Sequence, residues 1–148
     1  MSLGGTPSPP RQKHQLQLGE SWLIDNEMGI MQTVVKDLLP QKTRWSQRAV
    51  ARHLVSDRQT VKSYAEQIAI VVPDYLRECP RNPDGSVMSG MSLSQYQAWV
   101  VCQLVTLGRT IRADLNGTSY RKVVKVTAVK QANLLSRAAW QEMQGHNS

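Results

Sequence analysis

The pattern of apolar and polar positions first becomes regular at Ser21. The nineteen residues up to Gly19 are rich in Pro, Gly, Gln and Ser, so residues 1–19 are expected to be a disordered tail. From there to Pro40, apolar side chains recur at steps of four, three, four and three residues: Ile24, Met28, Met31, Val35 and Leu38. This spacing predicts an amphipathic helix within residues 20–40. Its narrow apolar seam packs either against the rest of the chain, which we favour, or against a second subunit.

Two shorter helical patterns follow. The first begins near Ser46, a suitable N-cap, and places four side chains on one side: Ala49, Val50, His53 and Leu54. The second is expected from about Arg58 to Ile68, with four side chains facing inward: Val61, Tyr64, Ala65 and Ile68. The polar residues 56–59 separate the two patterns. The sequence therefore predicts two short helices joined by a tight turn.

The segment Gln47–Tyr64 fits a helix-turn-helix. Val50 and Val61 stand eleven residues apart, a spacing that this motif commonly shows, and Ala51 is small where the second helix crosses closest. The turn departs from the motif, because Val55 occupies the place where Gly is frequent and Ser56 the place of an apolar residue. A lengthened or differently capped turn is expected.

The pattern after Val72 and Pro73 is typical of strands. Residues 75–79 are predicted as one strand and 86–89 as the returning strand, with a turn over Asn82–Gly85. Gly85 supplies the positive φ that a hairpin turn usually requires. We therefore expect a small β-hairpin in this region.

The remaining chain is predicted to be helical. A third helix is expected from Ser92 or Ser94 to Leu107, with Gly108 as its C-cap and a short helix from Ile111 to Leu115 capped by Thr110. Its expected buried stripe comprises Tyr96, Trp99, Val100, Gln103, Leu104 and Leu107. One long helix is then predicted from about Ser119 to Met143. Its apolar candidates are Tyr120, Val123, Val124, Ala128, Leu134, Leu135 and Ala138.

The composition agrees with one mainly helical domain. The chain has 148 residues, of which 41% are hydrophobic and 20% charged, enough apolar material for a core. Trp45 and Trp99 are expected in that core, whereas Trp140 lies in the core or in a subunit interface. Residues 41–117 form the central domain in this interpretation, and residues 118–148 form a C-terminal helix and tail.

The positive charge of the chain indicates what kind of partner it binds. The formal net charge is +7 at pH 7, which favours a polyanionic ligand. The excess lies in two segments: residues 41–62 carry six basic side chains and one acidic, and residues 119–148 carry five and one. The C-terminal excess is equally consistent with an ordinary solvated helix face.

Several classes of protein are not expected. No apolar run approaches the ~20 residues of a membrane-spanning helix, and the N-terminus does not resemble a secretory signal, so a cytoplasmic protein is predicted. Cys79 and Cys102 are expected to be reduced thiols. The three histidines, His14, His53 and His146, have no suggestive catalytic partner, and no phosphate-binding loop or metal-ligand pattern is present. We predict neither enzymatic activity nor a bound metal or cofactor.

The helix-turn-helix assigns candidate DNA contacts. Its second helix is expected to present Arg58, Gln59, Lys62, Ser63 and Glu66 to a major groove. Arg58 and Gln59 are the best candidates for reading bases, because Arg pairs bidentately with guanine and Gln with adenine. Lys62, Arg44 and Arg48 are better placed to neutralise phosphates, and Thr60 fits either role. The alternative is a helical hairpin with a solvated basic face.

The order of these elements resembles the winged-helix domain of MerR-type transcription regulators. The likeness spans Trp45 to Asn116 and includes the helix-turn-helix, the hairpin, Tyr96 near the start of the next helix, and the step Leu107-Gly108 before Thr110-Ile111. The resemblance implies that the hairpin is a wing whose Arg77 and Arg81 touch the DNA backbone, and that the helix from Ser119 pairs with its copy in a dimer. An additional N-terminal helix and a short Val72–Tyr75 stretch depart from the family pattern.

The expected function follows from the resemblance. Too few residues follow the winged domain for an effector-binding domain, so no small-molecule effector is expected. The chain is similar to the compact effector-less repressors that accompany type V-K CRISPR-associated transposons. We predict a homodimer that binds double-stranded DNA at a pseudo-palindromic operator and represses by occluding a promoter. The alternative is an excisionase-like accessory factor that bends DNA for a recombinase.

Overall fold

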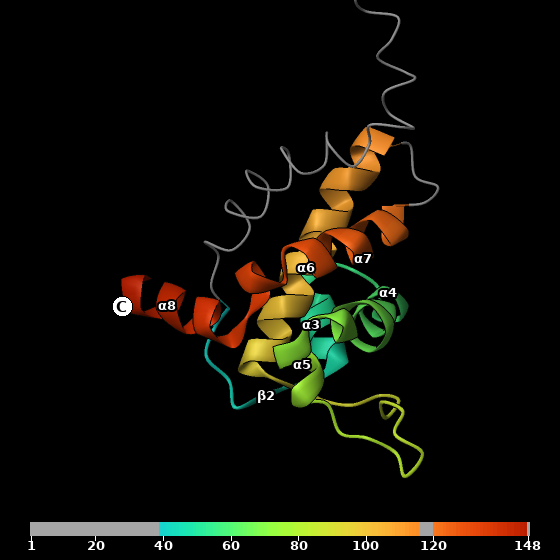
Figure 1. Ribbon diagram of the computed structural model, residues 1–148, viewed down its shortest axis with the longest axis vertical. Coiled ribbons are helices and arrows are strands. Elements are labelled where there is room, and N and C mark those ends of the chain that lie inside the picture. The colour runs from blue at the N-terminus through green and yellow to red at the C-terminus, as the bar shows by residue number, and fades with distance from the viewer. Residues whose placement is uncertain (1–38, 116–119, 148) are drawn as a thin grey trace, which may run out of the picture.

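The computed structural model describes residues 39–115 and 120–147 (Figure 1). The predicted N-terminal tail and nearly all of the predicted helix within 20–40 lie outside the described residues. The described part is mainly helical, as predicted. Its α-helices are α3 (Gln47–Leu54), α4 (Arg58–Ser63), α5 (Pro73–Arg77), α6 (Gln95–Leu115), α7 (Tyr120–Lys130) and α8 (Arg137–Asn147). Within the same ranges, no helix is both long and apolar enough to cross a membrane.

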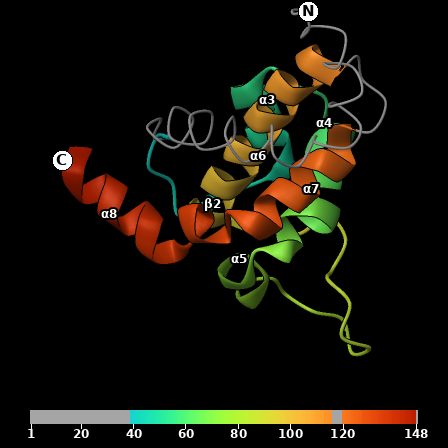
Figure 2. The same cartoon turned by 45° about the horizontal axis from the view of Figure 1, so that its top comes forward.

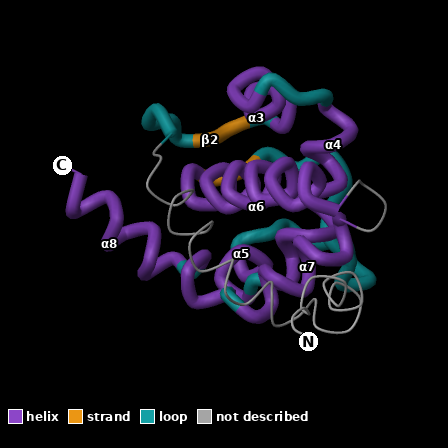
Figure 3. Tube along the Cα trace, turned by 90° about the horizontal axis from the view of Figure 1, so that it is seen from above, coloured by secondary structure: helices purple, strands orange, loops and turns teal. Residues whose placement is uncertain are grey.

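Helix α6 is the centre of the core. Every residue from Tyr96 to Val105 is buried, so the stripe predicted for this helix is confirmed and extends around its whole circumference. Figure 3 shows α6 between α3 on one side and α5 and α7 on the other. A helix that is buried on all sides needs neighbours on all sides, and the surrounding helices provide them.

Helices α3 and α4 form the tightly joined pair that the sequence predicts. Ser46 caps α3 by accepting a hydrogen bond from the N–H of Ala49 at 3.0 Å, and Asp57 caps α4 by accepting from the N–H of Thr60 at 2.7 Å. Between them, Val55 adopts a left-handed conformation with φ of 52°. The turn thus keeps the backbone conformation for which Gly is usual, with a β-branched residue in its place.

The chain stays helical after α4 but changes its winding. A π-helical turn (Tyr64–Ile68) completes the range predicted for the second helix, and a 3-10 turn (Ala69–Val71) continues beyond it. The four side chains predicted to face inward along this stretch are all buried. The change of winding was not expected from the apolar spacing.

The predicted first strand of the hairpin is wrong, because residues 73–77 form helix α5. Pro73 is the first residue of that helix, where its missing N–H and fixed φ are favourable. The turn over Asn82–Gly85 is confirmed: the N–H of Gly85 donates to Asn82 O at 2.8 Å, and Gly85 has φ of 93°. The hairpin around it is held by a single bridge between Arg81 and Val87, so the predicted returning strand is reduced to one paired residue.

The two-stranded sheet of the described chain lies elsewhere. Strand β2 (Arg44–Trp45) pairs antiparallel with β3 (Leu93–Ser94), and Trp45 lies opposite Leu93. Both of these side chains are buried, which confirms the predicted core position of Trp45. This pairing joins the segment before α3 to the segment before α6.

Gly108 does not end a helix, contrary to prediction. Helix α6 continues through it to Leu115, so the predicted short helix from Ile111 is the last part of α6. A Cβ atom at position 108 would overlap the hydroxyl oxygen of Tyr64 and lie 3.2 Å from Cζ of the same ring. Glycine is therefore required by the close approach of a tyrosine from another element, and not by backbone conformation.

The predicted single C-terminal helix is also wrong. The chain leaves α7 at Lys130, forms a 3-10 turn (Ala132–Leu135) and starts α8, whose Ser136 accepts a hydrogen bond from Ala139 N–H at 3.0 Å. Ser136 is thus the N-cap of α8, and the apolar residues predicted for one helix are shared between α7, the 3-10 turn and α8. Of the predicted apolar positions, Val124, Ala128 and Leu135 are buried and Ala138 is exposed.

Helix α8 extends away from the other helices in each view (Figures 1, 2 and 3). Its base is fixed by Trp140, which is 9% exposed and lies with its ring centroid 5.7 Å from that of Tyr96. Arg137 reinforces this attachment by pairing with Glu78 and by donating its N–H to Asp74 at 2.9 Å. Trp140 therefore belongs to the core of the described chain.

Candidate nucleic-acid interface

The first turn of α4 exposes the two side chains predicted to read bases. Arg58 and Gln59 follow the Asp57 cap directly and are both exposed. Neither side chain has a hydrogen bond or ion pair with any residue in the described ranges. The buried side of the same helix is occupied by Val61, which has no exposed surface. Helix α4 thus directs a guanidinium and a carboxamide into solvent from a rigid turn.

The C-terminal half of α4 is used differently. Lys62 forms an ion pair with Glu66 at 2.9 Å and also donates to the hydroxyl of Ser89. Glu66 is half-buried and accepts further hydrogen bonds from Gln47 Nε2 at 2.8 Å and from the N–H of Gly90 at 2.7 Å. The predicted exposure of Glu66 to a groove is wrong, because its carboxylate ties α3, α4 and the chain after the hairpin together.

This network sets the ionisation of Glu66. Burial by itself would raise the pKa, but the hydrogen bonds from Gln47, Lys62 and Gly90, together with the Lys62 charge, outweigh burial and lower the pKa. The carboxylate is therefore charged at neutral pH. Lys62 lies between this carboxylate and the hairpin, so it also holds the hairpin beside α4.

Thr60 and Ser63 are half-buried and already have partners. The Thr60 hydroxyl donates to the second carboxylate oxygen of Asp57 at 3.1 Å, which strengthens the cap of α4. The Ser63 hydroxyl accepts a hydrogen bond from Arg121 of α7 at 3.3 Å. Within α4, Arg58 and Gln59 are therefore the predicted DNA-binding residues without a partner among the described residues.

The two arginines predicted ahead of α4 differ in their surroundings. Arg44, in β2, donates to the carbonyl and hydroxyl oxygens of Ser92, each at 2.9 Å. Arg48, on α3, is exposed and makes no hydrogen bond or ion pair in the described part of the chain. Arg48 is therefore the freer cation.

The hairpin contributes one of its two predicted arginines. Arg81 lies in the bridge of the hairpin, and its guanidinium donates to Gly85 O at 3.2 Å. Arg77 lies in α5, outside the hairpin, and pairs with Asp74 at 2.8 Å. Its predicted place in a wing is wrong because Pro73 starts a helix. Figures 1 and 2 show the hairpin projecting from the helical body near α5.

Sequence reasoning missed a second group of cations. Arg109 and Arg112 of α6 and Arg121 of α7 surround the rings of Tyr64 and Tyr120. The signal was the spacing of three between Arg109 and Arg112, which places both on one helix face. It was missed because the helix was expected to end at Gly108.

The residues considered for catalysis have structural surroundings. His53 is exposed and packs edge-on against Trp45, with ring centroids 5.8 Å apart. Cys79 and Cys102 are buried, and burial raises their thiol pKa values to about 11 and about 12. His14 and the side chain of His146 lie outside the described residues. Among the described side chains, no group of three or more His, Cys, Asp or Glu is arranged to hold a metal ion.

No protein-family model, curated protein or solved structure matches this chain.

Proposed function

We propose that the protein binds double-stranded DNA, with α3 and α4 acting as a helix-turn-helix, α4 as the recognition helix and the hairpin around Arg81 as a wing. The proposal rests on one observation: Arg58 and Gln59 are exposed, without a partner among residues 39–115 and 120–147, on the first turn of a capped helix whose opposite side is buried. Recognition helices of this kind contact base edges with their N-terminal residues.

The surroundings of α4 support a division of labour. Arg58 suits a bidentate contact to guanine and Gln59 one to adenine, while Arg48 and Arg81 lie on the elements that flank α4 and are exposed for phosphate contacts. Lys62 has to give up its contacts with Glu66 and Ser89 before it binds a phosphate. We therefore expect Lys62 to matter more for the position of the hairpin than for affinity.

A homodimeric MerR-type repressor is the biological role that we propose. A single α4 offers few base contacts, each worth about 1–3 kcal/mol, so one copy falls short of the specificity needed in a genome. Two copies on a pseudo-palindromic operator double the contacts. Bound in this way, the dimer occludes a promoter.

The test is a fluorescence-anisotropy titration of the full chain with its own upstream duplex and with a scrambled duplex. Arg58→Ala and Gln59→Ala are expected to reduce the preference for the upstream duplex by roughly 5- to 150-fold. Lys122→Ala is the matched control, because Lys122 is an exposed cation on α7 and its loss should weaken both duplexes alike. Equal affinity of the parent protein for both duplexes would reject sequence-specific binding.

A further inference from the structure

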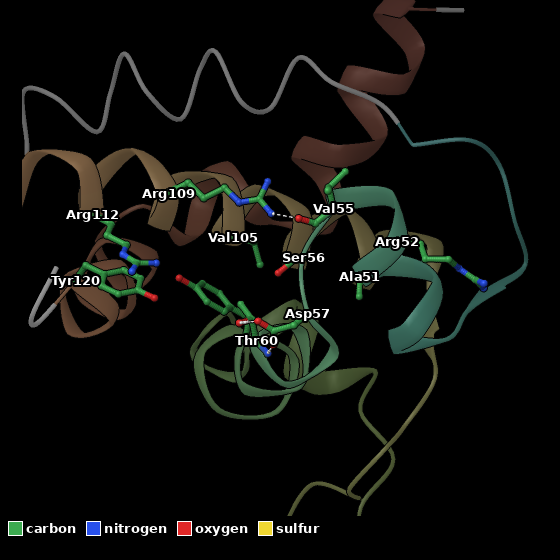
Figure 4. A pocket seen from close by; sticks show the side chains of 11 residues that line it. Ala51, Arg52, Val55, Ser56, Asp57, Thr60, Val105, Arg109, Arg112 and Tyr120 are labelled. Atoms are coloured by element: carbon green, nitrogen blue, oxygen red, sulfur yellow. Dashed lines mark hydrogen bonds between the residues drawn. The ribbon is translucent and has the colours of Figure 1, made fainter.

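A cleft lies beside the turn that joins α3 and α4. Its volume is about 680 Å³, and its lining comes from the turn itself, from α3 and α4, from Tyr64 at the start of the π-helical turn, from α6 and from the first residue of α7. Figure 4 shows Arg109 extending from α6 to the backbone of Val55 in the turn, and Arg112 lying beside Tyr120, farther from the turn. Volumes of about 300–1,000 Å³ are usual for small-ligand sites.

The two α6 arginines give the cleft its charge. Arg109 donates through Nη2 to the carbonyl oxygens of Leu54 at 2.6 Å and Val55 at 3.3 Å. Both of its hydrogen bonds to described residues use Nη2, which leaves Nε and Nη1 as donors. Arg112 stacks over Tyr120 at 5.5 Å from the ring centroid and has no ion pair with a described side chain.

Other charged groups do not cancel this excess. Arg121 lies outside the lining but stacks on the same ring of Tyr120, 5.8 Å from its centroid. The lining contains one carboxylate, that of Asp57, whose single negative charge is smaller than the combined charge of the two α6 arginines; its oxygens accept hydrogen bonds from Thr60. Arg52 also belongs to the lining, but Figure 4 shows its side chain directed away from Arg109 and Arg112.

Planar guanidinium groups with free N–H donors match the oxygens of a phosphate, and the stacked ring holds one of them in place. We propose that this cleft binds a phosphate group through Arg109 and Arg112. The phosphate belongs either to the DNA backbone, in which case the inference rests on the proposed function, or to a small phosphorylated molecule. Because Arg109 also holds the carbonyls at the turn, occupation of the cleft fixes the start of α4.

The first arm of the test uses inorganic phosphate and adenosine monophosphate as probes. Each is titrated calorimetrically into the full chain at constant ionic strength. If the source is a small molecule, a saturable isotherm is expected, and Arg112→Gln should weaken it about tenfold or more. Lys122→Gln is the charge-matched control and should leave the isotherm unchanged, because Lys122 does not line the cleft.

The second arm measures duplex affinity between low and moderate salt. If the source is the DNA backbone, Arg112→Gln should weaken the upstream and scrambled duplexes alike and reduce the slope of log K against log salt by about 0.9. Arg112 is exposed and its contact to described residues is the stacking on Tyr120, so the variant should fold; far-ultraviolet circular dichroism checks this.

The two arms separate failure of this inference from failure of the proposed function. Either a phosphate isotherm or a reduced salt slope that depends on Arg112 supports the cleft as a phosphate site. If the parent binds no duplex, the proposed function fails and the calorimetric arm alone decides. Absence of both effects in the folded variant overturns the inference.

Discussion

Gly108→Ala tests the closest approach between elements in the core. Gly108 lies inside α6, and an added methyl group would meet the hydroxyl of Tyr64, a side chain that is only 1% exposed. Because the ring is buried, it cannot swing away from the methyl group at low cost. We expect Gly108→Ala to destabilise the protein although alanine is the better helix former.

The size of the effect follows from two opposing terms. Forcing an extra methyl group into a packed core costs about 1–3 kcal/mol, and the severe overlap with the hydroxyl favours the upper end. The higher helix propensity of Ala relative to Gly stabilises the folded state by about 1 kcal/mol. The expected net loss is about 2 kcal/mol. In a Tyr64→Phe background the hydroxyl is absent and the nearest ring atom is 3.2 Å away, so the same substitution should be nearly neutral.

The assay is a double-mutant cycle by urea denaturation, followed through tryptophan fluorescence, since Trp99 is buried in α6, the helix that carries Gly108. A coupling of about 2 kcal/mol between positions 64 and 108 is expected. The C-cap role that the sequence suggests for Gly108 makes a different prediction, because a left-handed glycine is destabilised by alanine whatever residue occupies position 64. Equal losses in both backgrounds would therefore refute the close-approach argument.

Three further predictions concern the turn, the carboxylate network and the thiols. Val55→Gly should stabilise the protein by about 0.5–1 kcal/mol, because relief of left-handed strain exceeds the added chain entropy and Val55 is 88% exposed, so no packing is lost. Glu66→Gln should cost about 1–2 kcal/mol at pH 7. In the folded protein the pKa of Glu66 is lowered from 4.5, its ordinary value. The ionised carboxylate therefore stabilises the fold above that pH, and this stabilisation is lost on acidification. The cost of Glu66→Gln should accordingly be smaller at pH 3. Cys79 and Cys102 should react with a thiol-specific reagent only as fast as the protein opens, because both are buried with raised pKa values.

Each of these has a contrary outcome. A lower urea midpoint for Val55→Gly would mean that the left-handed turn is not strained. A Glu66→Gln cost that is the same at pH 3 and pH 7 would assign the effect to packing instead of ionisation. Labelling of Cys79 or Cys102 at the rate of a free thiol in native buffer would contradict its burial.

Local signals predicted the helical pair and the centre of the core. Ser46 was recognised as a cap because its side chain is followed at once by a helical apolar pattern, and Gly85 was recognised because only the turn geometry mattered there. The stripe through Trp99 needed no knowledge of its neighbours. These features depend on residues close in sequence, which a single chain displays directly.

The predictions that were wrong concern residues whose role depends on a contact with a residue distant in the sequence, or whose type suits two different roles. A glycine at position 108 is compatible both with a helix C-cap and with the close approach of Tyr64, and Tyr64 lies far away in the sequence. Pro73 suggested a break, although it is equally suited to begin a helix. The number of exposed polar side chains on and after α4 was overestimated for a related reason. Lys62 and Glu66 stand four residues apart, a spacing that favours pairing with each other over full exposure.

The short pairing of Arg44–Trp45 with Leu93–Ser94 has a topological consequence. The helical pair, α5 and the hairpin all lie between these two strands, so that whole stretch enters and leaves the molecule at adjacent points. A segment with neighbouring ends can be exchanged for another of different length without moving the flanking chain. The exposed surface of α4 and the hairpin is thus anchored to the chain at one place. Residues 46–92 also bury Val50, Tyr64 and Ile68 in the core around α6, so a replacement of this stretch has to keep those core positions.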